Sequence, residues 1–167
     1  VVADGTSSEA QAHVNEVDGN DNQIDVDALG ASSEATANEN QVEGNANEIR
    51  VVTDGAESVG SADSNEISGQ ENEVDVDVDG TGAVASANDN EVDGNDNDIE
   101  VDADGNNSTV EADDNEVDGN DNDIRAEATG AAVSAEVNAN DNELTGADHD
   151  INVTADNVIR LLPPLIF

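Results

Sequence analysis

The chain has 167 residues and a formal net charge of −39, because 42 acidic residues stand against three arginines. With one aromatic residue, Phe167, and no Trp, Tyr, Met or Cys, it can build neither a core of large side chains nor a disulfide framework. The charge argues against nucleic acid and anionic membrane surfaces as partners, and no apolar run is long enough to span a bilayer. Charge and low hydropathy alone also fit a disordered chain.

One sequence motif recurs at a fixed interval through most of the chain. The run NEVDGNDNDI at residues 90–99 recurs almost unchanged at 115–124, which gives a period of about 25 residues. Related runs lie at residues 15–24, 40–49, 65–74 and, after a slightly longer step, at 142–151. Disorder gives no reason for such fixed columns, so we predict an all-β fold, a parallel β-solenoid of about six coils over residues 1–156. A monomer that is disordered until it polymerises or binds cations is the open alternative.

The elements of one coil are clearest in the fourth copy. Small residues at 83–87 and the segment 90–93 each predict a short strand. Residues 97–105 alternate strictly between apolar and acidic side chains, which predicts a strand with one buried face and one carboxylate face. The alternation changes phase between 87 and 90 and again across 94–96, so the chain bends there. We therefore expect two or three short strands in each coil.

Asparagine and glycine occupy fixed columns near these bends. Stacked coils would place identical side chains about 4.8 Å apart, so that each buried amide bonds to the copies above and below it. The predicted ladders are Asn15, Asn40, Asn65, Asn90 and Asn115, and Asn22, Asn47, Asn72, Asn97 and Asn122. The predicted turn column is Gly19, Gly44, Gly69, Gly94 and Gly119.

Most outward strand positions carry carboxylates. Ca²⁺ prefers carboxylate and amide oxygens, which suggests sites between coils. The candidate ligands are Asp93, Asp96 and Asp98 in one coil and Asp118, Asp121 and Asp123 in the next. The alternative is a diffuse acidic face that divalent or monovalent cations screen, as is typical of adaptation to high salt.

The two ends of the repeat differ. Residues 157–167 form an apolar tail, which either caps its own rod or docks on the next subunit. Residues 1–5 are in phase with residues 26–30, so the given sequence begins part-way through a coil and we expect an edge that is open to a neighbour. Contact between these ends would propagate a head-to-tail homopolymer. The predicted inter-subunit residues are Val1, Val2, Val158, Ile159, Leu161, Leu162, Leu165, Ile166 and Phe167.

The pattern Val92-x-Gly94-x-x-Asn97-x-Ile99, which recurs with minor variation in the five regular copies, resembles the curlin repeat of bacterial curli fibres. That repeat has the signature Gln-x-Gly-x-x-Asn-x-Ala. Gly94 and Asn97 match it, and an apolar residue replaces the glutamine. The resemblance covers residues 1–155 and implies strands that stack into an extracellular, amyloid-like fibre.

We therefore expect a structural subunit of an extracellular fibre, in a biofilm matrix or a surface filament. No secretion signal is visible, so an exported chain would be the mature form. The alternative is a monomeric, cation-binding spacer in a surface adhesin. An enzyme is not expected, because His13 and His149 lie far apart and no long loop walls a cleft. Ice binding is disfavoured because the outward residues are carboxylates and not rows of threonine.

Overall fold

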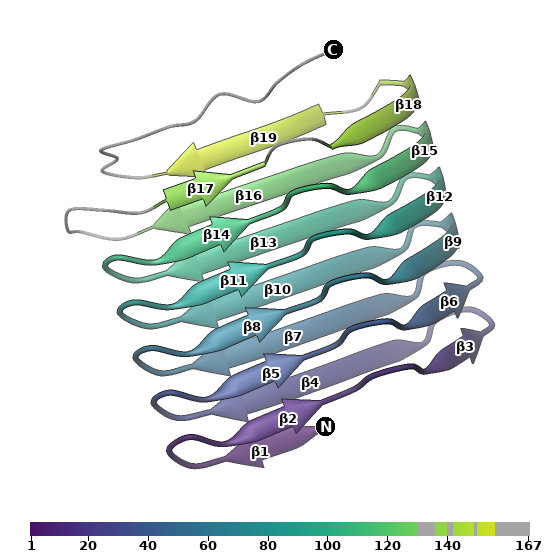
Figure 1. The fold of residues 1–167 in the computed structure, drawn as a ribbon. Helices are drawn as coiled ribbons and strands as arrows, with labels where there is room; N and C mark the ends of the chain where they lie inside the picture. Colours follow the sequence, from purple (N-terminus) through teal and green to yellow (C-terminus); the bar gives the residue numbers. More distant parts are fainter. Residues whose placement is uncertain (130–135, 140–141, 149, 156–167) are drawn as a thin grey trace.

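The computed structural model describes residues 1–129, 136–139, 142–148 and 150–155. These residues form only strands and their connections, and the strands pair in parallel into three sheets. The prediction of an all-β parallel solenoid of about six coils is confirmed. Figure 1 shows the coils stacked one above another, with the N-terminus at the bottom. The predicted tail, with Val158, Ile159, Leu161, Leu162, Leu165, Ile166 and Phe167, lies outside the described residues, as does His149.

Each coil contributes one strand to each sheet, so the coil has three strands. Sheet A is formed by β1 (Val2–Asp4), β4 (Gln23–Leu29), β7 (Glu48–Asp54), β10 (Glu73–Asp79), β13 (Asp98–Asp104), β16 (Asp123–Thr129) and β19 (Asp150–Ala155). Sheet B is formed by β2 (Glu9–Gln11), β5 (Glu34–Thr36), β8 (Val59–Ser61), β11 (Val84–Ser86), β14 (Thr109–Glu111) and β17 (Glu136–Asn138). Sheet C is formed by β3 (Glu16–Asp18), β6 (Gln41–Glu43), β9 (Glu66–Gln70), β12 (Glu91–Asn95), β15 (Glu116–Asn120) and β18 (Glu143–Ala147).

The pairing register equals the sequence repeat. Glu73 pairs with Asp98, its equivalent in the next copy of the repeat, and the same offset holds from the first coil to the fifth. In the last coil Asp123 pairs with Asp150, so the register follows the longer final step of the sequence. Identical columns of the sequence therefore lie directly above one another through the stack.

Three bends close each coil, and each contains a residue in the left-handed backbone region. In the fourth coil these residues are Gly82, Asp89 and Asp96, with φ of 71°, 56° and 58°. Asn107 occupies the first of these bends in the next coil. The segments from Gly82 to Asp89 and from Asp89 to Asp96 are therefore short, and the segment from Asp96 to Asn107 is longer. The two short intervals carry the short strands of sheets B and C, and the long interval carries the strand of sheet A.

The glycine column of sheet C is required by the close approach of the coils. Gly94 lies within β12 at a φ of 147°, and the bend itself lies at Asp96. A Cβ atom on Gly94 would overlap the carbonyl oxygen of Gly69 in the preceding coil. The predicted turn glycines Gly44, Gly69 and Gly119 meet the same obstacle, whereas Gly19 has no coil beneath it.

The core is thin because only small and β-branched side chains fill it. Val26, Val51, Val76 and Val101 form a buried column on sheet A, opposite the alanine column of sheet B. In the neighbouring column of sheet A, Val78 is larger than Ala28 and Ala103, and sheet B has Gly60 beside it, at which a Cβ would lie 2.7 Å from Val78 Cγ2. Paired changes of size thus keep the two sheets at one separation.

Candidate functional site

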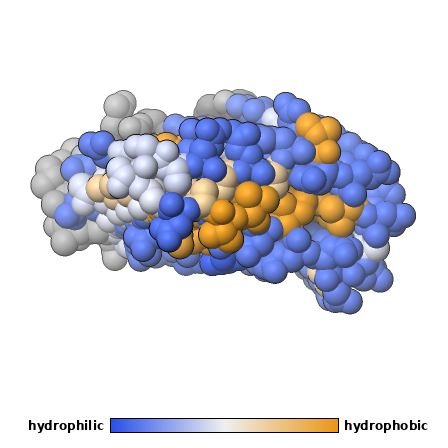
Figure 2. All heavy atoms as spheres, turned by 90° about the horizontal axis from the view of Figure 1, so that it is seen from below, coloured by the Kyte–Doolittle hydropathy of each residue, from blue (hydrophilic) through white to orange (hydrophobic). Residues whose placement is uncertain are grey.

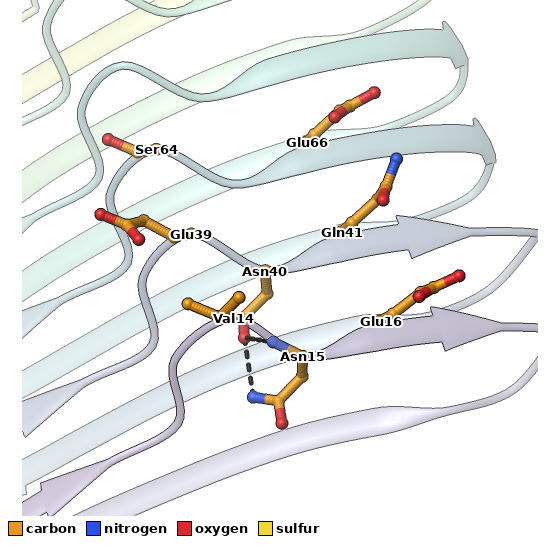
Figure 3. Close-up of a pocket in the computed structure, with 8 residues that line it drawn as sticks. All are labelled: Val14, Asn15, Glu16, Glu39, Asn40, Gln41, Ser64 and Glu66. Atoms are coloured by element: carbon orange, nitrogen blue, oxygen red, sulfur yellow. Dashed lines mark hydrogen bonds between the residues drawn. The ribbon is translucent and has the colours of Figure 1, made fainter.

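The first asparagine column forms a continuous ladder of side-chain hydrogen bonds. The Oδ1 of Asn65 accepts hydrogen bonds from the backbone N–H of Asn40 and from its Nδ2, both at 3.0 Å. The Nδ2 of Asn65 donates in turn to Asn90 Oδ1 at 3.0 Å. The same bonds recur from Asn15 to Asn142, and Figure 3 shows the first step of this ladder, between Asn15 and Asn40. The buried amides therefore join every pair of successive coils.

The second asparagine column clamps each coil onto the backbone of the coil before it. Asn97 Oδ1 accepts the backbone N–H of Asn72 at 2.9 Å, and Asn97 Nδ2 donates to the carbonyl oxygen of Gly69 at 3.2 Å. Asn72 and Asn122 make the equivalent contacts. Because these residues are buried, the bonds satisfy backbone groups that the bends remove from the sheets.

Two further columns point toward the following coil, and sequence reasoning did not single them out. Asn38 Oδ1 accepts the backbone N–H of Asp63, and Asp63 Oδ1 accepts that of Asn88, both at 2.8 Å. Asn45 Oδ1 likewise accepts the N–H of Gln70 at 2.9 Å. These columns contain both Asn and Asp, so they do not stand out in the sequence as a repeated residue. Most of their residues nevertheless have a short side chain with an oxygen that can accept a hydrogen bond. Side chains of each coil therefore form hydrogen bonds with the backbone of both the preceding and the following coil.

A shallow groove follows the bend before sheet C across the first three coils (Figure 3). The amide ladder forms its floor, and the column of first residues of sheet C forms one rim. Its lining residues are Val14, Asn15, Glu16, Glu39, Asn40, Gln41, Ser64 and Glu66. The polar groups of its floor are used in coil stacking.

The first coil leaves part of this bonding capacity unused. Asn15 and Asn22 donate to Asn40 and Asn47, but their own Oδ1 atoms accept nothing from the described residues. Val1, Val2 and Val14 are 60%, 66% and 73% exposed. Figure 2, which looks onto this end of the rod, shows an apolar band rimmed by hydrophilic surface. This end thus presents hydrogen-bond acceptors beside an apolar strip.

The outer face of sheet A carries rows of carboxylates. All outward positions of β10 and β13 are acidic, namely Glu73, Asp75, Asp77, Asp79, Asp98, Glu100, Asp102 and Asp104. Arg50 lies 3.4 Å from Asp75 and within 3.9 Å of Asp25 and Asp27, and Arg125 contacts Glu100 and Glu127. These two arginines neutralise only part of the face.

Burial and crowding change the acidity of this face. Loss of solvent raises the pKa of Asp75 to about 6, although Arg50 acts in the opposite direction. Burial also raises the pKa of Asp102 to about 6, and the negative charges of Asp104, Glu127 and Asp77 add to the effect. The buried Oδ1 of Asp102 has no hydrogen-bond partner. The centre of sheet A therefore holds carboxylates that take up protons more readily than usual.

The predicted calcium ligands do not converge. Asp93, Asp96 and Asp98, like Asp118, Asp121 and Asp123, are exposed around the bend between sheets C and A. Asp118 accepts a hydrogen bond from Thr145 Oγ1 at 2.7 Å, and Asp123 accepts the N–H of Asp150 at 3.1 Å. Across the part of the chain that the structure describes, no three His, Cys, Asp or Glu side chains are grouped to hold a metal ion. The calcium sites therefore stay a prediction, beside the alternative of a diffuse acidic face.

These features define a class of protein, the three-sided parallel β-solenoid whose coils are joined by side-chain ladders. Comparison with known protein families, curated proteins and solved structures finds no match for this chain. Among the described residues there is no helix long and apolar enough to cross a membrane.

Proposed function

We propose that the chain is the structural subunit of an extracellular fibre, in which copies assemble head to tail by stacking their coils. The observation that carries this proposal is the bonding capacity left free at the first coil. Asn15 and Asn22 occupy the columns in which every later asparagine accepts a hydrogen bond from the preceding coil. A coil of a second copy would meet them with the bonds that already join coils within one chain.

The charge distribution favours the last described coil as the complementary surface. Three of its outward residues, Thr145, Asn152 and Thr154, are neutral and stand in register with Asp118, Arg125 and Glu127 of the coil before, whereas Glu143 and Asp150 keep the acidic character of their columns. In a stack of copies, Val2 would follow Thr154 in its column, and Asp18 would follow Thr145. Like-charge repulsion between subunits is then lower than between the central coils of one subunit. The apolar residues 158–167 would supply a connector beyond this surface.

In this proposal, cations in solution screen the repulsion between the carboxylates of stacked coils. Two carboxylates about 4.8 Å apart repel by about 0.9 kcal/mol even in water, and the acidic columns contain many such pairs. Salt shortens the range of this repulsion, and divalent ions such as Ca²⁺ reduce it at lower concentration. The resemblance to the curlin repeat supports an extracellular fibre, in a biofilm matrix or a surface filament.

Electron microscopy of the purified chain, with and without Ca²⁺, tests the fibre proposal. We expect filaments one solenoid wide that are more abundant or longer when cations are added. Single rods of about 30 Å in every ionic condition would contradict the proposal.

The second candidate is a monomeric, cation-binding spacer in a surface adhesin. The observation in its favour is the continuous pairing of all three sheets along the rod, which makes a stiff element. Deletion of residues 158–167 separates the two functions. A connector should be needed for filaments, whereas deletion from a spacer should leave a monomer of lower stability. Sedimentation of the full and shortened chains at matched ionic strength measures the difference.

A further inference from the structure

We propose that the outer face of sheet A is a pH-sensitive device that tightens the stack of coils as the pH falls from neutral to mildly acidic values. Its effect on the stability of one chain rests on the fold alone. Its extension to assembly rests on the proposed function, because subunits would stack through the same kind of contact.

The geometry of the device is set by parallel pairing in register. Asp77 lies beside Asp102, and Asp79 lies beside Asp104, on the two central strands β10 and β13. Residues in this register on the same face of neighbouring strands are separated by about 4.8 Å, the distance between the strands. Like charges directly opposite each other in a sheet are destabilising, so the ionised face strains the interface between these coils.

Among the described residues, no cation is free to relieve Asp102, whose Oδ1 is buried without a hydrogen-bond partner. The charged groups around it on β10, β13 and β16 are Asp75, Asp77, Asp79, Glu100, Asp104, Arg125 and Glu127. Arg125 is engaged by Glu100 and Glu127. On the inner side, β13 packs against β11 and β14, which present the buried Ala85 and Val110. Glu111 follows Val110 in the alternation of β14 and therefore points away from this core.

Protonation changes repulsion into attraction at this position. An ionised carboxylate only accepts hydrogen bonds, whereas a protonated carboxyl carries an O–H that can donate to a neighbouring carboxylate. The buried Oδ1 of Asp102 has no partner, and the hydrogen bond that the carboxylate accepts from the Ala103 backbone offsets only part of its loss of solvent. One proton held between facing carboxyls removes a charge and adds a bond across two coils.

The direction of the effect follows from the acidity of these groups in the folded chain. Burial and neighbouring acids raise the pKa of Asp102 to about 6, and burial raises that of Glu73, Asp79 and Asp98. The folded chain therefore binds more protons than the unfolded chain between about pH 4 and pH 6. Stability should rise as the pH falls through about 6, and the gain should be lost as the pH rises again. Most proteins with paired carboxylates show the opposite trend.

The test is urea unfolding of the soluble monomer at pH 7.5 and pH 5.0 and at fixed ionic strength. We expect the folding equilibrium constant to be at least about tenfold larger at pH 5.0, because Asp102 alone contributes about this factor and Asp75 acts in the same direction. The double variant Asp77→Asn/Asp102→Asn should be more stable than the parent at pH 7.5 and should lose the roughly tenfold pH dependence that Asp102 contributes, while the part that Asp75 contributes remains. The matched control is Asp93→Asn/Asp118→Asn, which removes the same charge from a facing pair on sheet C.

The control variant should keep the pH dependence of the parent, because its two substitutions lie outside sheet A. It therefore distinguishes the effect of the sheet A carboxylates from a general effect of net charge. An equilibrium constant that is unchanged or smaller at pH 5.0 would overturn the inference. Equal loss of pH dependence in both double variants would also overturn it. Electron microscopy of the same samples tests the proposed function separately. A chain that forms no filaments at either pH would contradict the fibre. The unfolding result would still test the pH dependence of the single chain.

Discussion

Thr53 places a hydroxyl group in the apolar interior. Its side chain is fully buried between Ala28 and Val78 of the neighbouring coils, and its Oγ1 has no hydrogen-bond partner. An unpaired buried hydroxyl carries an uncompensated loss of solvation. Its position in an apolar column therefore identifies a local weakness of the second coil.

We expect Thr53→Val to raise the free energy of unfolding by about 1 kcal/mol, because valine has nearly the same shape and no polar atom to bury. Urea unfolding monitored by circular dichroism measures the change. Thr36→Val is the matched control, since Thr36 Oγ1 lies 3.0 Å from His13 Nε2 and should lose stability on substitution. A lower midpoint for Thr53→Val would show that its hydroxyl is satisfied in solution.

At the scale of elements, the ladders predict a contrast between equivalent residues in different coils. Asn65→Ala removes the acceptor for both the backbone N–H and the Nδ2 of Asn40, so it should cost about 2–4 kcal/mol of unfolding free energy. Asn15→Ala should cost about 1 kcal/mol or less, because Asn15 Oδ1 accepts nothing from the described residues. Equal losses in the two variants would mean that ladder bonds contribute little and that asparagine stabilises the bend itself.

The strands and their columns were predictable from the sequence because alternation and the regular repeat report directly on buried faces. The segments 83–87, 90–93 and 97–105 correspond to β11, β12 and β13. The choice between two and three strands was left open, since the strand of sheet B is only three residues long and its side chains are small.

The bends and the second pair of ladders were harder to predict. Val14 and Ala46 lie in the left-handed region with φ of 54°, although neither residue type signals it. The neighbouring coil holds these bends by backbone bonds such as that from Val14 N–H to the carbonyl of Asn38. The convergence of Asp93, Asp96 and Asp98 on a metal stays a prediction without support in the described geometry.

At the scale of the whole molecule, one interface repeated from coil to coil accounts for both the rod and the proposed fibre. The apolar part of this interface is thin, and its amide ladders are continuous. On its outer face, the carboxylates of neighbouring coils repel one another. The balance between these parts should respond to salt and to pH without any change of fold. In the proposed fibre, the first coil would offer the same interface to a second copy, so the fold would not limit the length of the fibre.

The most direct test of this account is the layer spacing of the assembled protein, determined by cryo-electron microscopy of filaments. The stacking of coils predicts layers of about 4.8 Å that continue without interruption across subunit boundaries, and an axial rise of about 30 Å per subunit. The strands should lie perpendicular to the filament axis. Isolated rods in all conditions, or filaments in which rods lie side by side with their coil ends exposed, would contradict head-to-tail stacking.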